Sequence, residues 1–193
     1  MTHMMTHTER KTALRARAMA RRRARSKEER ARDSRAVCAL IESSAVFAEA
    51  DCVLLYAPVH GEFDLSPLAA AAAERRIPIG YPRIAGDGHM TYHTVADPAA
   101  LVPGAFGIPA PAEEAPAIHP TDKTLLLIPA LMGDGAGYRL GYGGGYFDRF
   151  LPTFPGRGVL VLPADEIVPC LPVEENDVAV PYLITPAGWY RGV

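Results

Sequence analysis

Four consecutive large apolar residues at positions 125–128, followed closely by a cluster of glycines, constrain the fold of this chain more than any other feature. A strand that is apolar on both faces must be buried on both faces, as parallel strands inside α/β sheets are. Seven glycines then fall within the 13 residues 133–145. Open α/β sheets bind ligands beyond the carboxyl ends of their strands, so this pattern predicts a functional site in residues 129–150.

The rest of the chain alternates short apolar segments with helical patterns, which predicts one α/β domain, residues 1–193, with helices covering a mostly parallel sheet. Residues 1–8 are expected to be disordered. A helix is expected from Ser66, as its cap, to Arg76, and another over 146–151. Six prolines in residues 98–120 predict a loop-rich crossover without a helix. The expected strands are 52–57, 77–82, 89–95 (antiparallel), 158–162 and 182–185, the last closing the sheet.

The N-terminus is strongly basic although the chain as a whole carries a net charge of −2. Residues 1–35 contain 12 Lys or Arg and 4 Asp or Glu. Leu14 and Met19 interrupt the arginines, and Ser26 with Glu29 forms a capping-box pattern that opens a second helix. A packed helical hairpin with an exposed arginine face is favoured over a nucleic-acid-binding arm, which would interleave aromatic residues.

Several classes of protein are disfavoured by composition. No apolar run approaches the roughly 18 to 20 residues that a membrane span needs, and no secretory signal is recognisable, so a cytoplasmic protein is expected. The three cysteines, Cys38, Cys52 and Cys170, are odd in number and far apart, which argues against a disulfide framework or a structural metal. A cysteine in apolar company is more often a small buried residue than a nucleophile.

The glycine cluster itself predicts a phosphate-binding loop. Glycine admits positive φ, so successive backbone N–H groups can converge on an anion that no Cβ excludes. A following helix would add the partial positive charge of its N-terminus. A flexible linker is the alternative, but this cluster lacks serine and is interleaved with Arg139 and three tyrosines. It matches neither the G-x-x-x-x-G-K-[ST] loop nor the dinucleotide fingerprint.

Residues 137–148, GYRLGYGGGYFD, resemble the signature of the 5-formyltetrahydrofolate cyclo-ligase family, also called methenyltetrahydrofolate synthetases. Three other segments resemble family landmarks in the family's order: KTALR at 11–15, GEFD at 61–64 and PVEEND at 172–177. Together they cover nearly the whole chain. The resemblance implies a three-layer α/β/α domain of the kind found in ribose-5-phosphate isomerase and CoA transferases.

The resemblance also implies an activity. Family members convert 5-formyltetrahydrofolate to 5,10-methenyltetrahydrofolate while ATP becomes ADP and phosphate. A formamide oxygen is a poor leaving group, so attack by N10 on the formyl carbon would stall. Transfer of the γ-phosphoryl group to that oxygen lets N10 attack and phosphate depart, which leaves positioning and charge neutralisation to the protein.

Site residues follow from the resemblance, position by position. ATP is expected at Lys11, Arg15, Arg139, Gly141, Gly143, Gly144 and Gly145. Mg²⁺ is expected at Asp148 and Asp177, and the folate at Ala57, Glu62, Tyr142 and Tyr146. Arg139 and Tyr146 are the expected catalytic residues. Taken without the resemblance, the charged residues among these would be solvated helix or turn charges.

The expected partners are ATP and 5-formyltetrahydrofolate, with no nucleic acid and no membrane, for a monomer. A divergent ATP-dependent enzyme acting on another formamide-like substrate, and a nucleotide- or RNA-binding module, are the alternatives. The chain departs from the family where Asp165 and Glu166 are followed by Ile167, because the family has a Glu-Gln pair there. Pro129-Ala130 also stands where the family usually has Pro-Gly.

Overall fold

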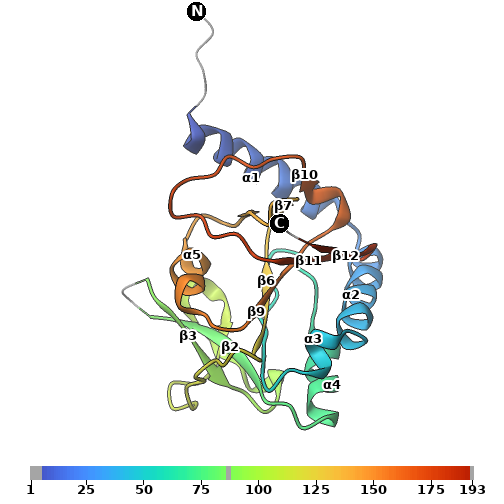
Figure 1. Ribbon diagram of the computed structural model, residues 1–193, viewed down its shortest axis with the longest axis vertical. Coiled ribbons are helices and arrows are strands. Elements are labelled where there is room, and N and C mark those ends of the chain that lie inside the picture. The colour runs from blue at the N-terminus through green and yellow to red at the C-terminus, as the bar shows by residue number, and fades with distance from the viewer. Residues whose placement is uncertain (1–5, 86–87, 192–193) are drawn as a thin grey trace, which may run out of the picture.

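The predicted doubly buried strand lies at the centre of a seven-stranded sheet (Figure 1). The computed structural model describes residues 6–85 and 88–191. Strand β6 (Leu125–Pro129) pairs in parallel with β1 (Val53–Leu54) on one side and with β9 (Arg157–Val161) on the other. The strand order is β12-β11-β9-β6-β1-β2-β3, so the apolar run at 125–128 was the correct guide to the centre of the fold.

The outer strands make the sheet mixed. β2 (Ile79–Ile84) and β11 (Tyr182–Thr185) continue the parallel pairing, whereas β3 (Met90–Thr94) and β12 (Gly188–Arg191) pair antiparallel at the two edges. The expected antiparallel strand at 89–95 is confirmed. The expectation that 182–185 closes the sheet is wrong, because the chain turns after Thr185 and returns as β12.

Helices cover both faces of the sheet, which confirms the three-layer α/β arrangement. Alternation along β6 sends Leu125 and Leu127 into one apolar cluster, and Leu126 and Ile128 into another. The first cluster is covered by α2 (Lys27–Glu42), α3 (Ala45–Ala48) and α4 (Ser66–Glu74). The second is covered by α5 (Tyr146–Phe150) and the 3₁₀ turn η3 (Leu151–Thr153). These helices lie on opposite sides of the sheet in Figure 1.

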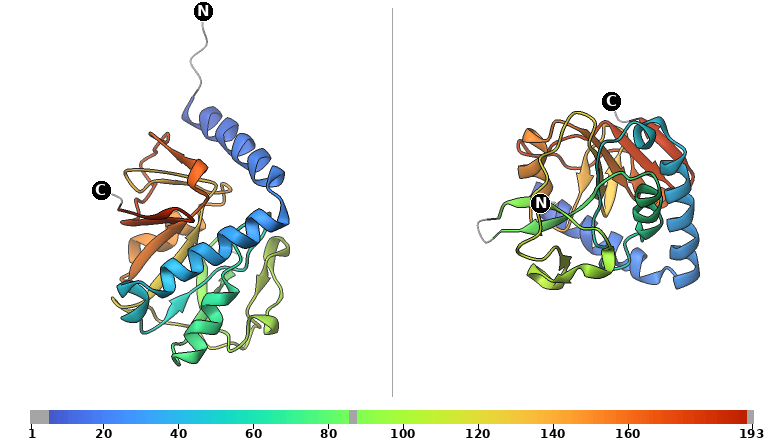
Figure 2. Two further views of the ribbon diagram at one scale, coloured as in Figure 1. Left: turned by 90° about the vertical axis from the view of Figure 1, so that its right-hand side faces the viewer. Right: turned by 90° about the horizontal axis from the view of Figure 1, so that it is seen from below.

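The two N-terminal helices are present, but they do not form a packed hairpin. Helix α1 (His7–Ala24) places Leu14 and Met19 against β7 (Met132–Asp134) and β8 (Arg139–Leu140), whereas α2 packs on the main sheet. Figure 2 shows the helices diverging from their shared turn. The capping box of Ser26 and Glu29 is confirmed, and both of its hydrogen bonds form.

The expected disorder of residues 1–8 is wrong for residues 6–8. Thr6 caps α1 and forms a second capping box with Glu9, and His7 and Thr8 begin the helix. The capping hydrogen bonds satisfy backbone donors that a helix end otherwise leaves free. Residues 1–5 lie outside the described residues.

A small second sheet separates the central strand from the glycine loop. β7 and β8 form a hairpin, and β10 (Ile167–Val168) pairs with β7 in parallel. Buried Asp134 stabilises the hairpin, because its carboxylate accepts the backbone N–H groups of Ala136, Tyr138 and Leu171. The glycine cluster is therefore split. Its first half shapes this hairpin, and only residues 141–145 form a loop into α5.

The hairpin makes a sharp stability prediction at Gly137. This residue has φ +87°, and an added Cβ would lie 2.3 Å from the carbonyl oxygen of Val180. Gly137→Ala is therefore expected to lower the free energy of unfolding by more than about 2 kcal/mol. Gly135→Ala is the matched control, since a Cβ there meets nothing within 4 Å. Urea denaturation of both variants checks this, and equal midpoints would contradict it.

Two smaller predictions concern the Ser66 cap and the proline-rich crossover. Ser66 does not cap α4; it is the first helical residue, and Asp64 accepts its backbone N–H. The crossover at 98–120 contains no α-helix, as predicted, but its short strands β4 (Val102–Pro103) and β5 (Pro109–Ala110) pair with each other. The remaining short elements are the 3₁₀ turns η1 (Pro98–Ala100), η2 (Ala105–Gly107) and η4 (Ala164–Glu166).

The cysteines and the helices can be compared with the expectations of no disulfide framework and no membrane span. Cys38 and Cys52 are buried, as expected of small core residues, whereas Cys170 is exposed in the loop after β10. All three thiols are free. Within the described ranges, no helix combines the length and apolar character that crossing a membrane requires.

Candidate active site

A cleft of about 1030 Å³ opens at the carboxyl ends of the parallel strands. The segment after β1, the ends of β2 and β6, the glycine loop, the start of α1 and the C-terminal loop at 174–178 all contribute to its walls. It brings together every site residue that the sequence predicted: Lys11, Arg15, Ala57, Glu62, Arg139, Gly141, Tyr142, Gly143, Gly144, Gly145, Tyr146, Asp148 and Asp177.

One wall pairs a lysine of α1 with two carboxylates. The Lys11 ammonium donates to Asp177 Oδ2 at 2.7 Å and to Glu174 Oε2 at 2.8 Å. Burial alone would lower the pKa of Lys11, but the hydrogen bonds and charges of Asp177 and Glu174 outweigh it and raise that pKa. The cleft therefore holds a fixed cation here, together with two acids within its reach.

The glycine loop crosses the cleft between β8 and α5. Gly143 and Gly145 have φ +103° and +67°, values that side chains rarely allow, so the backbone itself faces the cleft. Arg15 anchors the loop by donating from Nε to the Gly141 carbonyl at 2.9 Å. Helix α5 has only five residues, so its N-terminus adds less positive charge than a longer helix would.

Arg139 and Asp148 form a second ion pair in the cleft. The Arg139 guanidinium donates to Asp148 Oδ1 at 2.6 Å and to the Val178 carbonyl at 2.8 Å. Only 4% of the Arg139 side chain is exposed, against 31% for Asp148. Burial lowers the pKa of Arg139 while Asp148 raises it, and the net direction is downward. An arginine keeps its charge through such a shift. Arg139 is therefore a fixed cation, and its partner Asp148 is the more exposed of the two and can be displaced by a ligand.

Glu62 and Tyr142 line another part of the cleft, and Arg22 contacts both of them from behind the cleft wall. The Glu62 carboxylate accepts the Val59 N–H at 2.9 Å and lies 3.8 Å from Arg22. Burial raises the pKa of Glu62 to about 7, against the lowering effects of the Val59 hydrogen bond, Arg22 and Tyr142. Arg22 donates to the Tyr142 hydroxyl at 2.8 Å. Burial raises the pKa of Tyr142 to about 12, so its hydroxyl is protonated at neutral pH.

Aromatic rings line the mouth of the cleft. Phe106 is 77% exposed, has φ +57°, and lies 6.3 Å from the Tyr146 ring between centroids. The Arg149 guanidinium also lies against Tyr146, 5.1 Å from the ring centroid. Two aromatic faces and a cation at an open mouth suit a flat, partly charged ligand. Ala57, also predicted, is buried in the wall.

Sequence reasoning missed Arg22 and Phe106. Arg22 was assigned to an exposed arginine face, yet it is 5% exposed and points into the protein. The sequence did contain a signal for the inward direction of Arg22. Lys11, Arg15 and Arg22 are spaced i, i+4 and i+11, which places all three on the same face of a helix. Phe106 lies in the proline-rich crossover, where no periodicity marked it.

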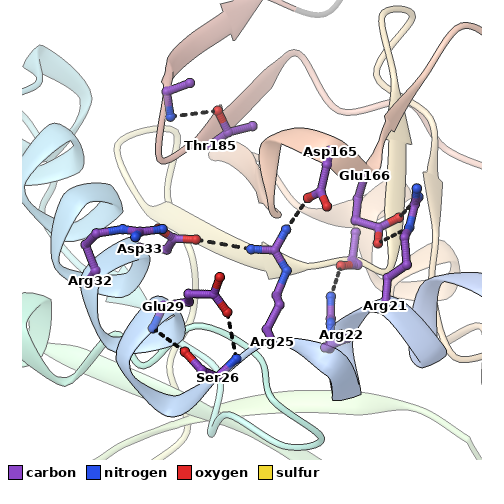
Figure 3. Close-up of polar contacts among 12 residues, drawn as sticks. Arg21, Arg22, Arg25, Ser26, Glu29, Arg32, Asp33, Asp165, Glu166 and Thr185 are labelled. Carbon is purple, nitrogen blue, oxygen red and sulfur yellow. Dashed lines mark hydrogen bonds and ion pairs between the residues drawn. The ribbon is translucent and has the colours of Figure 1, made fainter.

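Other arginines of the N-terminal segment have structural partners as well. Arg21 makes a bidentate contact with buried Glu166, and Arg25 pairs with Asp33 and Asp165 (Figure 3). Both acids at 165 and 166 belong to η4, the segment that departs from the family pattern. These contacts fix the end of α1 and weigh against the nucleic-acid-binding alternative.

The predicted metal ligands line the cleft, each beside a cation. Asp148 pairs with Arg139, and Asp177 pairs with Lys11. In the part of the chain that the structure describes, no group of three or more His, Cys, Asp or Glu side chains could hold a metal ion unaided. Mg²⁺ commonly binds through one or two carboxylates plus phosphate oxygens and water, so two such carboxylates fit a metal that arrives with a nucleotide.

The fold and the cleft together define a general class of protein. It is an open α/β protein whose cleft, at the carboxyl ends of parallel strands, combines glycine-rich backbone with buried cations. That combination suits a phosphate-bearing ligand.

Comparison with known proteins gives the particular family. Residues 7–186 match the 5-formyltetrahydrofolate cyclo-ligase family, to which this chain belongs. A solved Aquifex aeolicus 5,10-methenyltetrahydrofolate synthetase is 33% identical, with a TM-score of 0.83 over 94% of this chain and 92% of that one. A Mycoplasma pneumoniae synthetase, 20% identical over 91% of this chain and 98% of that one, shares the fold with a TM-score of 0.74.

Two named cyclo-ligases are similar over parts of their lengths. The Escherichia coli protein is 29% identical over 147 residues, which are 72% of this chain and 79% of that protein. The Mycolicibacterium smegmatis protein is 35% identical over 92 residues, 46% of this chain. That second match spans only 47% of the mycobacterial protein.

Proposed function

We propose that this protein is an ATP-dependent ligase that cyclises 5-formyltetrahydrofolate to 5,10-methenyltetrahydrofolate, releasing ADP and phosphate. The observation that carries the proposal is the convergence of all the predicted site residues on one cleft. Four sequence landmarks, far apart in the chain, contribute to that cleft. Family membership and the related synthetase of known structure support the same reaction.

The reaction needs an activated formyl oxygen. The formyl oxygen takes the γ-phosphoryl group of ATP, and ADP leaves. The lone pair of N10 then forms the new C–N bond, the proton of N10 passes to the phosphate or to water, and the C–O bond breaks as phosphate departs. Neither step requires a strong base from the protein, because N10 is an amine nucleophile. The protein must hold the two substrates in line and neutralise charge on the transferred group.

The cations of the cleft are placed for that task. We assign the triphosphate to the wall formed by Lys11, Arg15, Arg139 and the amides of residues 141–145. Each of these side chains lines the cleft, and Lys11 and Arg139 are held by carboxylates that a more strongly charged phosphate can displace. Tyr146 is assigned to the reacting carbonyl, since it follows the loop directly.

Asp148 and Asp177 would hold Mg²⁺ once nucleotide is present. When bound, the metal supplies charge neutralisation at the phosphate oxygens. The two carboxylates come from different segments of the cleft wall, α5 and the 174–178 loop, and Arg139 joins these segments by donating to Asp148 and to the Val178 carbonyl. Glu62 is assigned to the pterin edge, because a carboxylate accepts its N–H donors.

One assay tests the function directly. The protein is mixed with 5-formyltetrahydrofolate, ATP and Mg²⁺, and the absorbance of the methenyl product is followed together with ADP release. We expect one ADP per product and no product without ATP. ATP hydrolysis or binding without methenyl formation would point instead to another formamide-like substrate.

A further inference from the structure

Arg22 does not line the cleft itself, but it joins three segments of the chain that border it. Its Nη2 donates to the Ala130 carbonyl at 2.6 Å, directly after β6, and its Nη1 donates to the Tyr142 hydroxyl at 2.8 Å in the glycine loop. The same Nη1 lies 3.8 Å from Glu62 Oε1, in the loop after β1. A planar guanidinium has the fixed fork geometry that lets one side chain serve several acceptors at once.

The surroundings are built for close approach of this side chain. Gly61, with φ +81°, precedes Glu62, and a Cβ there would lie 3.3 Å from Arg22 Cγ. Tyr56, Gly61 and Glu62 also share a small cavity with Arg22. Only 6% of the Arg22 side chain and 4% of the Glu62 side chain are exposed. Such burial of two charges is costly unless they are paired, so their proximity is a specific arrangement.

We propose that Arg22 is a positioning residue that fixes the Glu62 carboxylate and the Tyr142 hydroxyl as one polar unit at the folate end of the cleft. The role in folate recognition rests on the proposed function. Arg22 holds the unit in place from α1, the same helix that sends Lys11 and Arg15 to the phosphate end. It touches neither substrate, and it acts through the residues that do.

The charge of Glu62 is the measurable consequence. The groups that face it are Arg22 from α1, Tyr142 from the glycine loop, the Val59 N–H and, nearby, Tyr56. Arg22 is the only cation within salt-bridge distance of Glu62 among the described residues. Burial raises the pKa of Glu62 and Arg22 lowers it, so loss of the arginine must raise this pKa further.

Three variants separate positioning from structural support. Arg22→Met keeps an unbranched apolar side chain but removes both the positive charge and the forked donors of the guanidinium. Arg22→Lys keeps the positive charge and removes only the forked donors. Arg21→Met is the matched control, because Arg21 is the neighbouring residue of α1 and also pairs with a buried carboxylate, that of Glu166, outside the cleft. Thermal melting compares the folding of all three.

The first readout is the pH titration of Glu62, followed by the NMR signal of its labelled side-chain carboxyl carbon. Arg22→Met should raise the pKa of Glu62 by about one unit or more, and Arg22→Lys and Arg21→Met should leave it near the wild-type value. An unchanged Glu62 titration in Arg22→Met would overturn the proposal. This readout does not depend on turnover, so a shifted titration in a protein without cyclo-ligase activity would support the polar unit and refute only the proposed function.

The second readout separates the two substrates. Arg22→Met should raise KM for the folate about tenfold or more, since a charge-assisted contact is lost, with KM for ATP nearly unchanged. In the pH profile of this variant, kcat/KM for the folate should begin to fall on the acid side at a higher pH than it does in the wild-type protein. Arg22→Lys should show the raised KM for the folate without the shift of the pH profile. If Arg22→Met does not fold, Arg22→Lys provides the test in its place. A folate KM equal to wild type in Arg22→Lys, or equal losses in Arg21→Met and Arg22→Met, would contradict positioning by the fork.

Discussion

Arg139→Met is expected to reduce kcat/KM for ATP by about 100- to 1000-fold, the loss typical when one preorganised donor to a transition-state anion is removed. The Arg139 guanidinium is 4% exposed and held by Asp148 and the Val178 carbonyl, so it is already ordered where the phosphates are assigned. Methionine fills much of the same space without charge. Steady-state kinetics with varied ATP and saturating folate measure the effect.

The control for Arg139 is an arginine pair outside the cleft. Arg157 pairs with Glu49 at 2.7 Å, with 33% and 57% of the two side chains exposed. Exposed pairs contribute about 0 to 1 kcal/mol, so Arg157→Met should keep both turnover and most of the stability. If Arg139→Met turned over ATP as well as Arg157→Met did, the phosphate wall would be wrongly assigned.

Asp148→Asn is expected to lower turnover by about 100-fold or more, because a metal ligand contributes several kcal/mol of charge stabilisation at the phosphates. Asparagine keeps the size of the side chain and one acceptor oxygen for Arg139. Because asparagine still accepts a hydrogen bond from the buried Arg139 guanidinium and the Asp148 side chain is itself 31% exposed, the loss of stability should be small. Turnover at increasing Mg²⁺ concentration, together with thermal melting, checks both statements.

Asp165→Asn is the matched comparison for Asp148. Asp165 is also an aspartate paired with an arginine, Arg25, but it lies on η4 and does not line the cleft. It should keep wild-type turnover and the wild-type dependence on Mg²⁺. Unchanged activity in Asp148→Asn would remove the assignment of that carboxylate to the metal.

The centre of the fold and the site were predictable for a simple physical reason. A run that is apolar at every position can only be buried on both faces, which placed β6 in the middle of the sheet. A parallel strand ends at the ligand-binding edge, so the glycines after it had to lie near the site. The relation between Lys11 at the start of the chain and Asp177 near its end came from the family landmarks, because helical and strand periodicity say nothing about such long-range contacts.

What escaped prediction depends on long-range packing. The β7–β8 hairpin separates β6 from the glycine loop, and its stability comes from Asp134 accepting the distant Leu171 N–H. The arginines of α1 resembled a solvated face, since the buried acceptors that order them, Glu166 and the Ala130 carbonyl, are more than 100 residues away. Charge patterns alone cannot distinguish an exposed arginine from one with a remote partner.

The central claim is that the backbone amides of residues 141–145 enclose the transferable phosphate of ATP. A crystal structure with a non-hydrolysable ATP analogue, Mg²⁺ and the folate product tests it most directly. The account predicts the γ-phosphate between the Gly143–Gly145 amides and the Arg139 guanidinium, with Asp148 released from Arg139 toward the metal. Phosphates bound elsewhere, with the loop and the Arg139–Asp148 pair unchanged, would contradict it.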